Sequence, residues 1–156
     1  FHYRASVGQD LYRRSLYGFW RRSVGPALMF DASKRRVCQV RVTRTSTPLQ
    51  ALTLMNDRTF IEAGCHMALS DQRGGKPSIP SLFEAVLSRR ATELELTELN
   101  AQFDEALRYY QRHPEAGHAL LSGQPLSSRV ELTPARAALA IIGMTLLNLD
   151  EAITRQ

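Results

Sequence analysis

The chain has 156 residues, of which 44% are hydrophobic and 22% are charged. This length is enough for one domain with a buried core, and the composition argues against a wholly disordered chain. The net charge of +5 is unevenly spread: residues 1–50 contain ten basic and two acidic residues (+8), and residues 51–156 contain ten and thirteen (−3). We interpret the first set of arginines as partners of acidic groups in the same or the parent chain, and nucleic-acid binding is the weaker alternative.

The longest uncharged apolar stretch runs from Ala137 to Leu149. A helix needs about 20 such residues to cross a bilayer, so we expect a core helix here and no membrane span. The two cysteines, Cys38 and Cys65, lie in neither a CxxC nor a CxxCH spacing. The sequence therefore offers no zinc knuckle and no attachment site for c-type haem, and we expect no cofactor in this chain.

The first predicted element is a helix over residues 10–24. Apolar side chains such as Leu11 and Phe19 recur there at three- and four-residue spacing, and arginines cover other positions. The Gly-Pro pair at 25–26 ends this helix, because proline disfavours helical geometry in the residue before it. Residues 37–43 alternate apolar and polar without a visible partner strand, so we expect one long extended segment near residues 25–46.

The Thr-Pro pair at 47–48 predicts the start of the next helix, with the threonine as N-cap and the proline at the first helical position. The inner face of this helix is expected to consist of the apolar residues Leu49, Leu52 and Met55. The Asn-Asp pair at 56–57 indicates a break and a fresh cap, followed by a second helix. Residues 71–78, which contain glycines and a proline, predict a loop.

Two later helix starts carry the capping-box pattern, in which the first and fourth residues satisfy each other's free backbone N–H groups. They are residues 81–84 (SLFE) and 92–95 (TELE). From the second box an apolar stripe continues at helical spacing to Tyr110, and the His-Pro pair at 113–114 ends that helix. A short helix is expected over residues 115–121.

A second Thr-Pro pair, at 133–134, predicts the last helix, with one apolar face that continues to the C-terminus. That face consists of Leu139, Ile142, Leu146, Leu149 and Ile153. The elements together predict an all-α fold of about six helices in an irregular bundle. We expect residues 1–156 to form a single helical domain.

Residues 11–22 read LYRRSLYGFWRR, residues 44–52 read RTSTPLQAL, and residues 146–151 read LLNLDE. These motifs, in this order, resemble Planctomycete-specific domain one, a family of domains of unknown function. Ser46 departs from the family's usual asparagine, and Arg58 departs from its usual proline. Both departures affect caps and turns.

The resemblance implies a setting more than a mechanism. Domains of this family lie at the C-terminal end of large exported proteins, often behind a cytochrome c domain and a second domain of unknown function. The chain is therefore expected to be the C-terminal fragment of a larger protein outside the cytoplasm, in the periplasm or at the cell surface. Its expected partners are the preceding domains of that protein, including a c-type cytochrome domain.

The possible metal ligands do not converge. Cys65 and His66 are neighbours and would point about 100° apart on a helix, and His113 and His118 flank a proline at a spacing that shares no helical face. No GxSxG elbow and no Cys/His signature indicates a nucleophile, and the adjacent acids at 150–151 diverge. We therefore predict no catalytic and no metal-binding residue in this chain.

Polar and aromatic residues of the motifs form the candidate interaction cluster. It comprises Arg13, Arg14, Tyr17, Trp20, Arg44, Gln50, Asn56, Asn148, Asp150 and Glu151. Its basic and aromatic members could stack on bases or sugars, but the aromatic residues fall on both sides of their helix, as in a core helix. The three amides are expected to be buried and to bond backbone groups. We also expect the first helix to pack against the last, with an arginine at 13 or 14 paired to an acid at 150 or 151.

The sequence thus predicts a non-catalytic structural or interaction module that docks on the preceding domains and helps to present a haem partner or a carbohydrate ligand. The alternative is part of a polysaccharide-related enzyme active site that upstream residues complete. A groove lined by Arg14, Gln50 and Asp150 would favour the enzyme, and a dry core there would favour the module.

Overall fold

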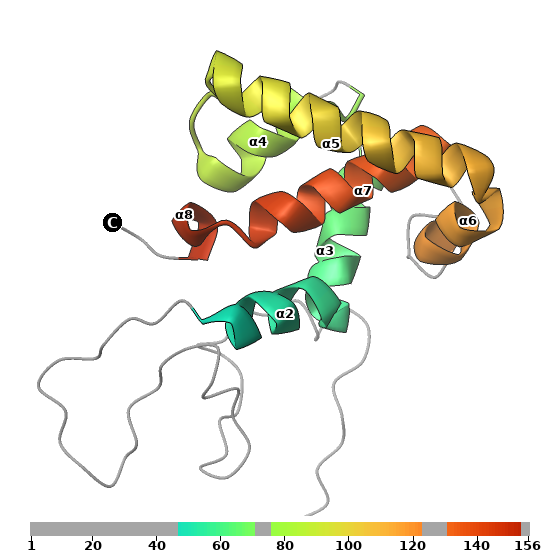
Figure 1. Cartoon of the computed structure of the whole chain (residues 1–156), viewed down its shortest axis with the longest axis horizontal. Helices are drawn as coiled ribbons and strands as arrows, with labels where there is room; N and C mark the ends of the chain where they lie inside the picture. Colours follow the sequence, from blue (N-terminus) through green and yellow to red (C-terminus); the bar gives the residue numbers. More distant parts are fainter. Residues whose placement is uncertain (1–46, 71–75, 123–130, 154–156) are drawn as a thin grey trace, which may run out of the picture. The chain divides into compact units, whose positions relative to one another are not determined.

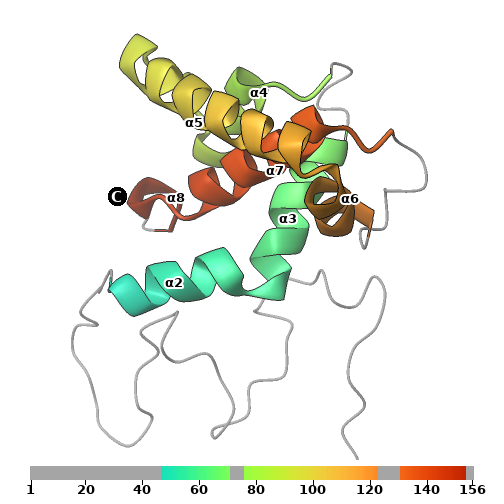
Figure 2. The same cartoon turned by 45° about the vertical axis from the view of Figure 1, so that its right-hand side comes forward.

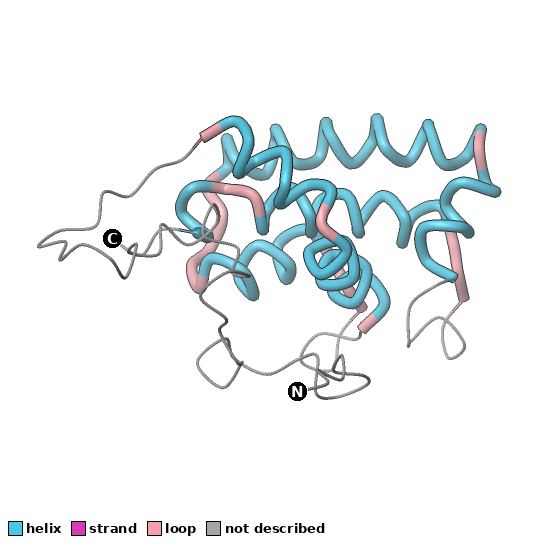
Figure 3. The backbone as a smooth tube through the Cα atoms, turned by 90° about the horizontal axis from the view of Figure 1, so that it is seen from below, coloured by secondary structure: helices cyan, strands magenta, loops and turns pink. Residues whose placement is uncertain are grey.

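The computed structural model describes residues 47–70, 76–122 and 131–153, and these residues form seven helices and no strand (Figure 1). The helices are α2 (Pro48–Asn56), α3 (Arg58–Leu69), α4 (Ile79–Leu87), α5 (Glu93–Arg112), α6 (Pro114–Ser122), α7 (Pro134–Leu147) and α8 (Asp150–Ile153). Figure 3 shows the same helices and the described loop residues beside them. The all-α prediction is confirmed.

The described residues all belong to one compact unit, residues 46–156. The helix predicted over residues 10–24 and the extended segment near residues 25–46 lie outside the described part. The single domain over residues 1–156 stays a prediction.

Helix α7 is the centre of the packing. It contacts α3, α4, α5 and α6, and in Figures 1 and 2 it runs between α3 and α5. Its buried residues are Ala137, Ala138, Leu139, Ala140, Ile142, Gly143 and Leu146. The predicted core helix is thus confirmed. None of the helices in the described part of the chain combines the length and apolar character needed to cross a membrane.

Helices α3 and α7 cross where two glycines meet. A Cβ atom on Gly143 would lie 3.2 Å from the carbonyl oxygen and 3.3 Å from the Cα atom of Gly64, so the two backbones approach closely. Near the end of α3, Nη1 of Arg136 on α7 donates to the carbonyl oxygens of Ala68 (2.9 Å) and Leu69 (3.2 Å). These bonds satisfy acceptors that the end of a helix leaves unpaired, and they hold α3 against α7.

Four predicted helix starts are confirmed. The N-caps are Thr47 for α2, Asp57 for α3, Thr92 for α5 and Thr133 for α7, and each side chain accepts a hydrogen bond from a backbone N–H of the first turn. Helix α5 ends before His113, as predicted. The short helix α6 also lies close to the position predicted for it, residues 115–121.

The predicted start of α4 at Ser81 is wrong by three residues. The N-cap is Ser78, and its backbone N–H donates to Oγ of Ser81, 2.9 Å away. With this start, Pro80 falls in the first turn, where its missing N–H is harmless. Serine thus takes the fourth position of the capping box, and Glu84 lies a turn further along.

The predicted inner face of α2 is also wrong. Leu49, Leu52 and Met55 are 54%, 58% and 49% exposed, and the buried residues of α2 are Gln50 and Leu54. At about 100° per residue, the three apolar residues are centred about 180° from the buried pair. They form an outward stripe on α2, which we call the α2 apolar stripe.

The predicted apolar face of the last helix does not continue to the C-terminus. Helix α7 ends at Leu147 with Asn148 as its C-cap, and the chain turns before α8. Leu149 and Ile153 are exposed in consequence.

Candidate functional site

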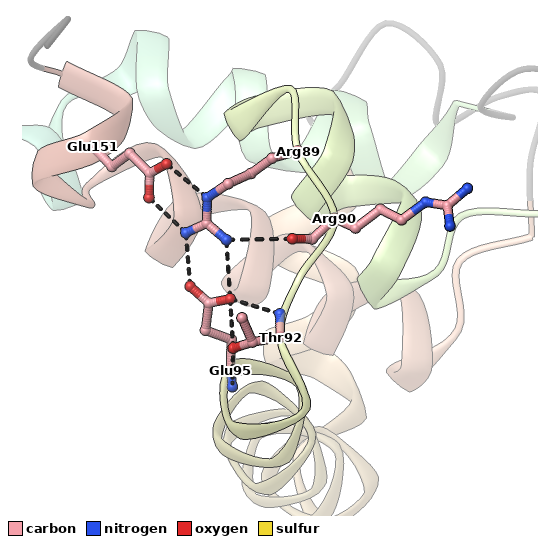
Figure 4. Close-up of polar contacts among 5 residues, drawn as sticks. All are labelled: Arg89, Arg90, Thr92, Glu95 and Glu151. Atoms are coloured by element: carbon pink, nitrogen blue, oxygen red, sulfur yellow. Dashed lines mark hydrogen bonds and ion pairs between the residues drawn. The ribbon is translucent and has the colours of Figure 1, made fainter.

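The most elaborate polar arrangement among the described residues centres on Arg89, which follows α4 (Figure 4). Its Nε and Nη2 donate to the two carboxylate oxygens of Glu151, and both donor–acceptor distances are 2.7 Å. On its other side, Nη1 and Nη2 donate to the carboxylate oxygens of Glu95, at distances of 3.0 and 2.7 Å. A fifth bond, 3.3 Å long, joins Nη1 to the carbonyl oxygen of Arg90. A guanidinium has five N–H donors, so this hydrogen-bonding capacity is fully used.

The chain holds Arg89 in place from three sides. Ser88, the C-cap of α4, has φ 57° and ψ 22°, a left-handed conformation that turns the chain sharply out of the helix. The guanidinium carbon then lies 4.9 Å from the ring centroid of the buried Phe83. Glu95 is fixed in turn by the cap of α5, since Thr92 donates to it from its backbone N–H (2.8 Å) and its hydroxyl (2.9 Å).

The two carboxylates and the guanidinium stabilise each other's charged forms. The hydrogen bond from Arg89, followed by the bonds from Thr92, lowers the pKa of Glu95 to about 2. The hydrogen bonds from Arg89 also lower the pKa of Glu151, and the bonds that Arg89 donates to Glu151 and Glu95 raise the pKa of Arg89 itself. The three side chains are 33–47% exposed, so solvent screens much of this attraction.

We expect Glu95→Gln to lower the melting temperature at pH 7 and to lose this effect in acid. Because folding depresses the pKa of Glu95, its ionised form stabilises the fold above the unfolded-state pKa of about 4.3. That contribution disappears as the pH falls through the folded-state value of about 2. Melting curves from pH 7 to pH 2 should show the difference between wild type and variant shrinking. The exposed Glu98→Gln serves as control, and a constant gap for Glu95→Gln would contradict the prediction.

The three predicted amides differ in their roles. Oε1 of the buried Gln50 accepts from the backbone N–H of Thr47 (2.7 Å), so it completes a capping box and bonds a backbone group as predicted. Nδ2 of Asn56 donates to the carbonyl oxygen of Leu52 (2.7 Å), but at an exposed position. Oδ1 of Asn148 is buried and accepts no hydrogen bond in the described part of the chain. The predicted bond to a backbone group is therefore absent for this oxygen.

Among the described residues the arginine partner of Glu151 is Arg89, which forms a two-pronged ion pair with it. The sharp turn after α4 places Arg89 beside α8, and this pairing joins residues 62 positions apart. The pairing of an arginine at 13 or 14 with an acid at 150 or 151 stays a prediction. Arg13, Arg14, Tyr17, Trp20 and Arg44 lie outside the described residues, and the groove that Arg14 would line with Gln50 and Asp150 stays untested.

The candidate ligands and nucleophiles of the described part stay apart. No group of three or more His, Cys, Asp and Glu residues could hold a metal ion within residues 47–70, 76–122 and 131–153. Cys65 is fully buried, and its Sγ donates to the carbonyl oxygen of Leu120 at a distance of 3.8 Å. Burial raises the pKa of this thiol to about 11, which keeps it protonated and a poor nucleophile near neutral pH.

The sequence motifs pointed to Glu151 and to the cap of α5, but not to Arg89, the residue that joins them. One signal was present, because Arg89 lies three residues before the N-cap Thr92, and the glutamate of that capping box has a second carboxylate oxygen that can accept a hydrogen bond. The pairing with Glu151 depends on how α4, α5 and α8 pack, and no local pattern contains that information.

Comparison with known proteins places the chain in a family. No curated protein and no solved structure matches it significantly. Residues 1–103 match the family model described as PSD1, Protein of unknown function (DUF1553). The matched segment extends into α5, and the LLNLDE motif at 146–151 lies beyond it. The chain therefore belongs to the PSD1 family of proteins of unknown function.

Proposed function

We propose that the chain is a non-catalytic interaction module of a larger exported protein and that it docks on the domains that precede it there. The α2 apolar stripe is the observation that carries this proposal. Three large apolar side chains on nine residues of helix are about half exposed, on the side opposite the residues that α2 buries. Soluble proteins expose single apolar residues routinely, but grouped ones mark surfaces that a partner covers.

The chemistry of α2 defines the kind of partner. The helix PLQALTLMN contains no charged residue, so recognition by this face depends on apolar contact and shape. Leucine and methionine fit an apolar helix face or loop of another domain, and methionine adapts to irregular surfaces. We infer that this partner surface lies in the preceding domains of the parent protein, outside the cytoplasm. On the family resemblance, those domains include a c-type cytochrome domain; a carbohydrate-related domain is the other partner that we propose.

Photo-crosslinking in the parent protein tests the proposal. Benzoylphenylalanine is introduced in place of Leu52, and mass spectrometry identifies the peptide to which it crosslinks on irradiation. Crosslinks to residues that precede Phe1 in the parent protein are expected. The same crosslinker in place of Gln102, an exposed polar residue of α5, is the matched control and should give no such product.

The other outcomes count against docking. Crosslinks confined to residues 1–46 would mean that this chain covers its own stripe, and the absence of any crosslink would mean that the stripe faces water. Crosslinks at the same level from position 102 would show that the reaction is unspecific.

A further inference from the structure

Helix α8 cannot be stable by its own hydrogen bonds. It has four residues, all exposed, and the backbone N–H groups of Ala152 and Ile153 both bond to the carbonyl oxygen of Leu149, over 3.0 and 3.3 Å. Isolated helices far longer than this are marginal in water, because helix nucleation is unfavourable. Contacts with the rest of the fold must therefore hold α8, and within the described residues α4 and α7 provide such contacts.

We propose that Arg89 is an electrostatic clasp that holds α8 in place through Glu151 and opens as ionic strength rises, while the remaining helices stay folded. Figure 4 shows the geometry: Glu151 reaches from α8 to the Nε–Nη2 edge of the guanidinium, and Glu95 occupies the neighbouring edge. Opening frees α8 and exposes the Nε–Nη2 edge of Arg89.

The two carboxylates on Arg89 are held unequally, and this asymmetry decides which one leaves first. Glu95 belongs to the first turn of the long helix α5 and also accepts two hydrogen bonds from Thr92. Glu151 lies on a short exposed helix, and its described hydrogen bonds are both from Arg89. Salt weakens both exposed pairs, since the Debye length falls from about 30 Å at 0.01 M to about 3 Å at 1 M. Of the two carboxylates, Glu151 is therefore the one that salt releases first.

The helices that pack on α8, and α8 itself, contain few other ionisable residues. The remaining ionisable residues of these helices are Glu84 on α4, Arg136 towards the far end of α7, and Asp150 on α8 itself. With Glu95 and Glu151 both ionised beside one guanidinium, the clasp carries one excess negative charge. This excess favours release of the less firmly held Glu151.

Backbone order parameters from ¹⁵N relaxation of the full chain test the clasp. In about 0.02 M salt the amides of Ala152 and Ile153 should approach the rigid value of about 0.85, and in about 1 M salt they should fall below about 0.6. The amides of Leu96 and Ala137 report on α5 and α7 and should stay rigid throughout. Glu151→Gln should make the α8 amides mobile already at low salt, and the charge-matched control Glu93→Gln should behave as wild type.

Each alternative result overturns the clasp. Order parameters for α8 that stay the same at low and high salt would show that the ion pair does not control its attachment. Loss of order at Leu96 and Ala137 together with α8 would mean general unfolding and not local opening. Equal mobility in Glu93→Gln and Glu151→Gln would assign the effect to total charge and not to the Arg89 pair.

Discussion

Replacing Gly64 with valine is expected to lower the free energy of unfolding by about 3 kcal/mol. Even a single Cβ atom at Gly64 would lie 2.6 Å from Cγ of Met144, 3.0 Å from the carbonyl oxygen of Ala140 and 3.1 Å from the backbone N of Met144. The methionine side chain can move aside, but the two backbone atoms belong to α7 and cannot. Valine adds two further methyl groups, so α3 must shift away from α7.

This cost exceeds the intrinsic gain from removing a helical glycine, which is about 1 kcal/mol or less. Urea unfolding should show a lower midpoint with an unchanged slope, the mark of lost stability without a change in the denatured state. Ala101→Val, at an exposed position of α5, is the control and should cost less than about 1 kcal/mol. Equal midpoints for the two variants would show that the crossing of α3 and α7 tolerates a wider spacing.

Local chemistry made several helix starts predictable. A cap and its partner lie two or three residues apart, so the pattern at Thr92 and Glu95 contains all the information that the first turn of α5 needs. The core helix α7 was predictable because its apolar residues leave few alternatives to burial. The Ser78 cap shows where such patterns become ambiguous: two overlapping boxes competed, and proline in the first turn favoured the earlier one.

Tertiary placement was not predictable in the same way. The stripe on α2 has the spacing of a buried face, but α7 and α3 take up the opposite side of that helix. Periodicity identifies a face without saying what covers it, and helix propensity says nothing about either. The partner of Glu151 was missed for a related reason, because an ion pair that joins residues 62 positions apart exists only after α4, α5 and α8 have packed.

Replacing Phe83 with alanine should lower the free energy of unfolding by about 3–5 kcal/mol. The Phe83 side chain is only 1% exposed and packs in the core with Ile79 and Leu82 of the same helix. Truncation would remove its apolar contacts and leave a cavity that a well-packed interior refills only in part. The ring also lies under the guanidinium of Arg89, so its loss removes one of the contacts that orient this side chain.

Two measurements separate these effects of Phe83. Denaturant unfolding reports the loss of overall stability. The control Leu94→Ala, at a position 73% exposed on α5, should change stability by no more than about 0.5 kcal/mol.

Phe83→Leu keeps an apolar side chain in the core but removes the ring. It should therefore destabilise the fold less than alanine does, and α8 should still become mobile at lower salt than in wild type. A stable Phe83→Leu protein with unaltered α8 order would show that the ring contributes packing alone. Near-wild-type stability of Phe83→Ala would mean that the neighbouring core collapses into the space.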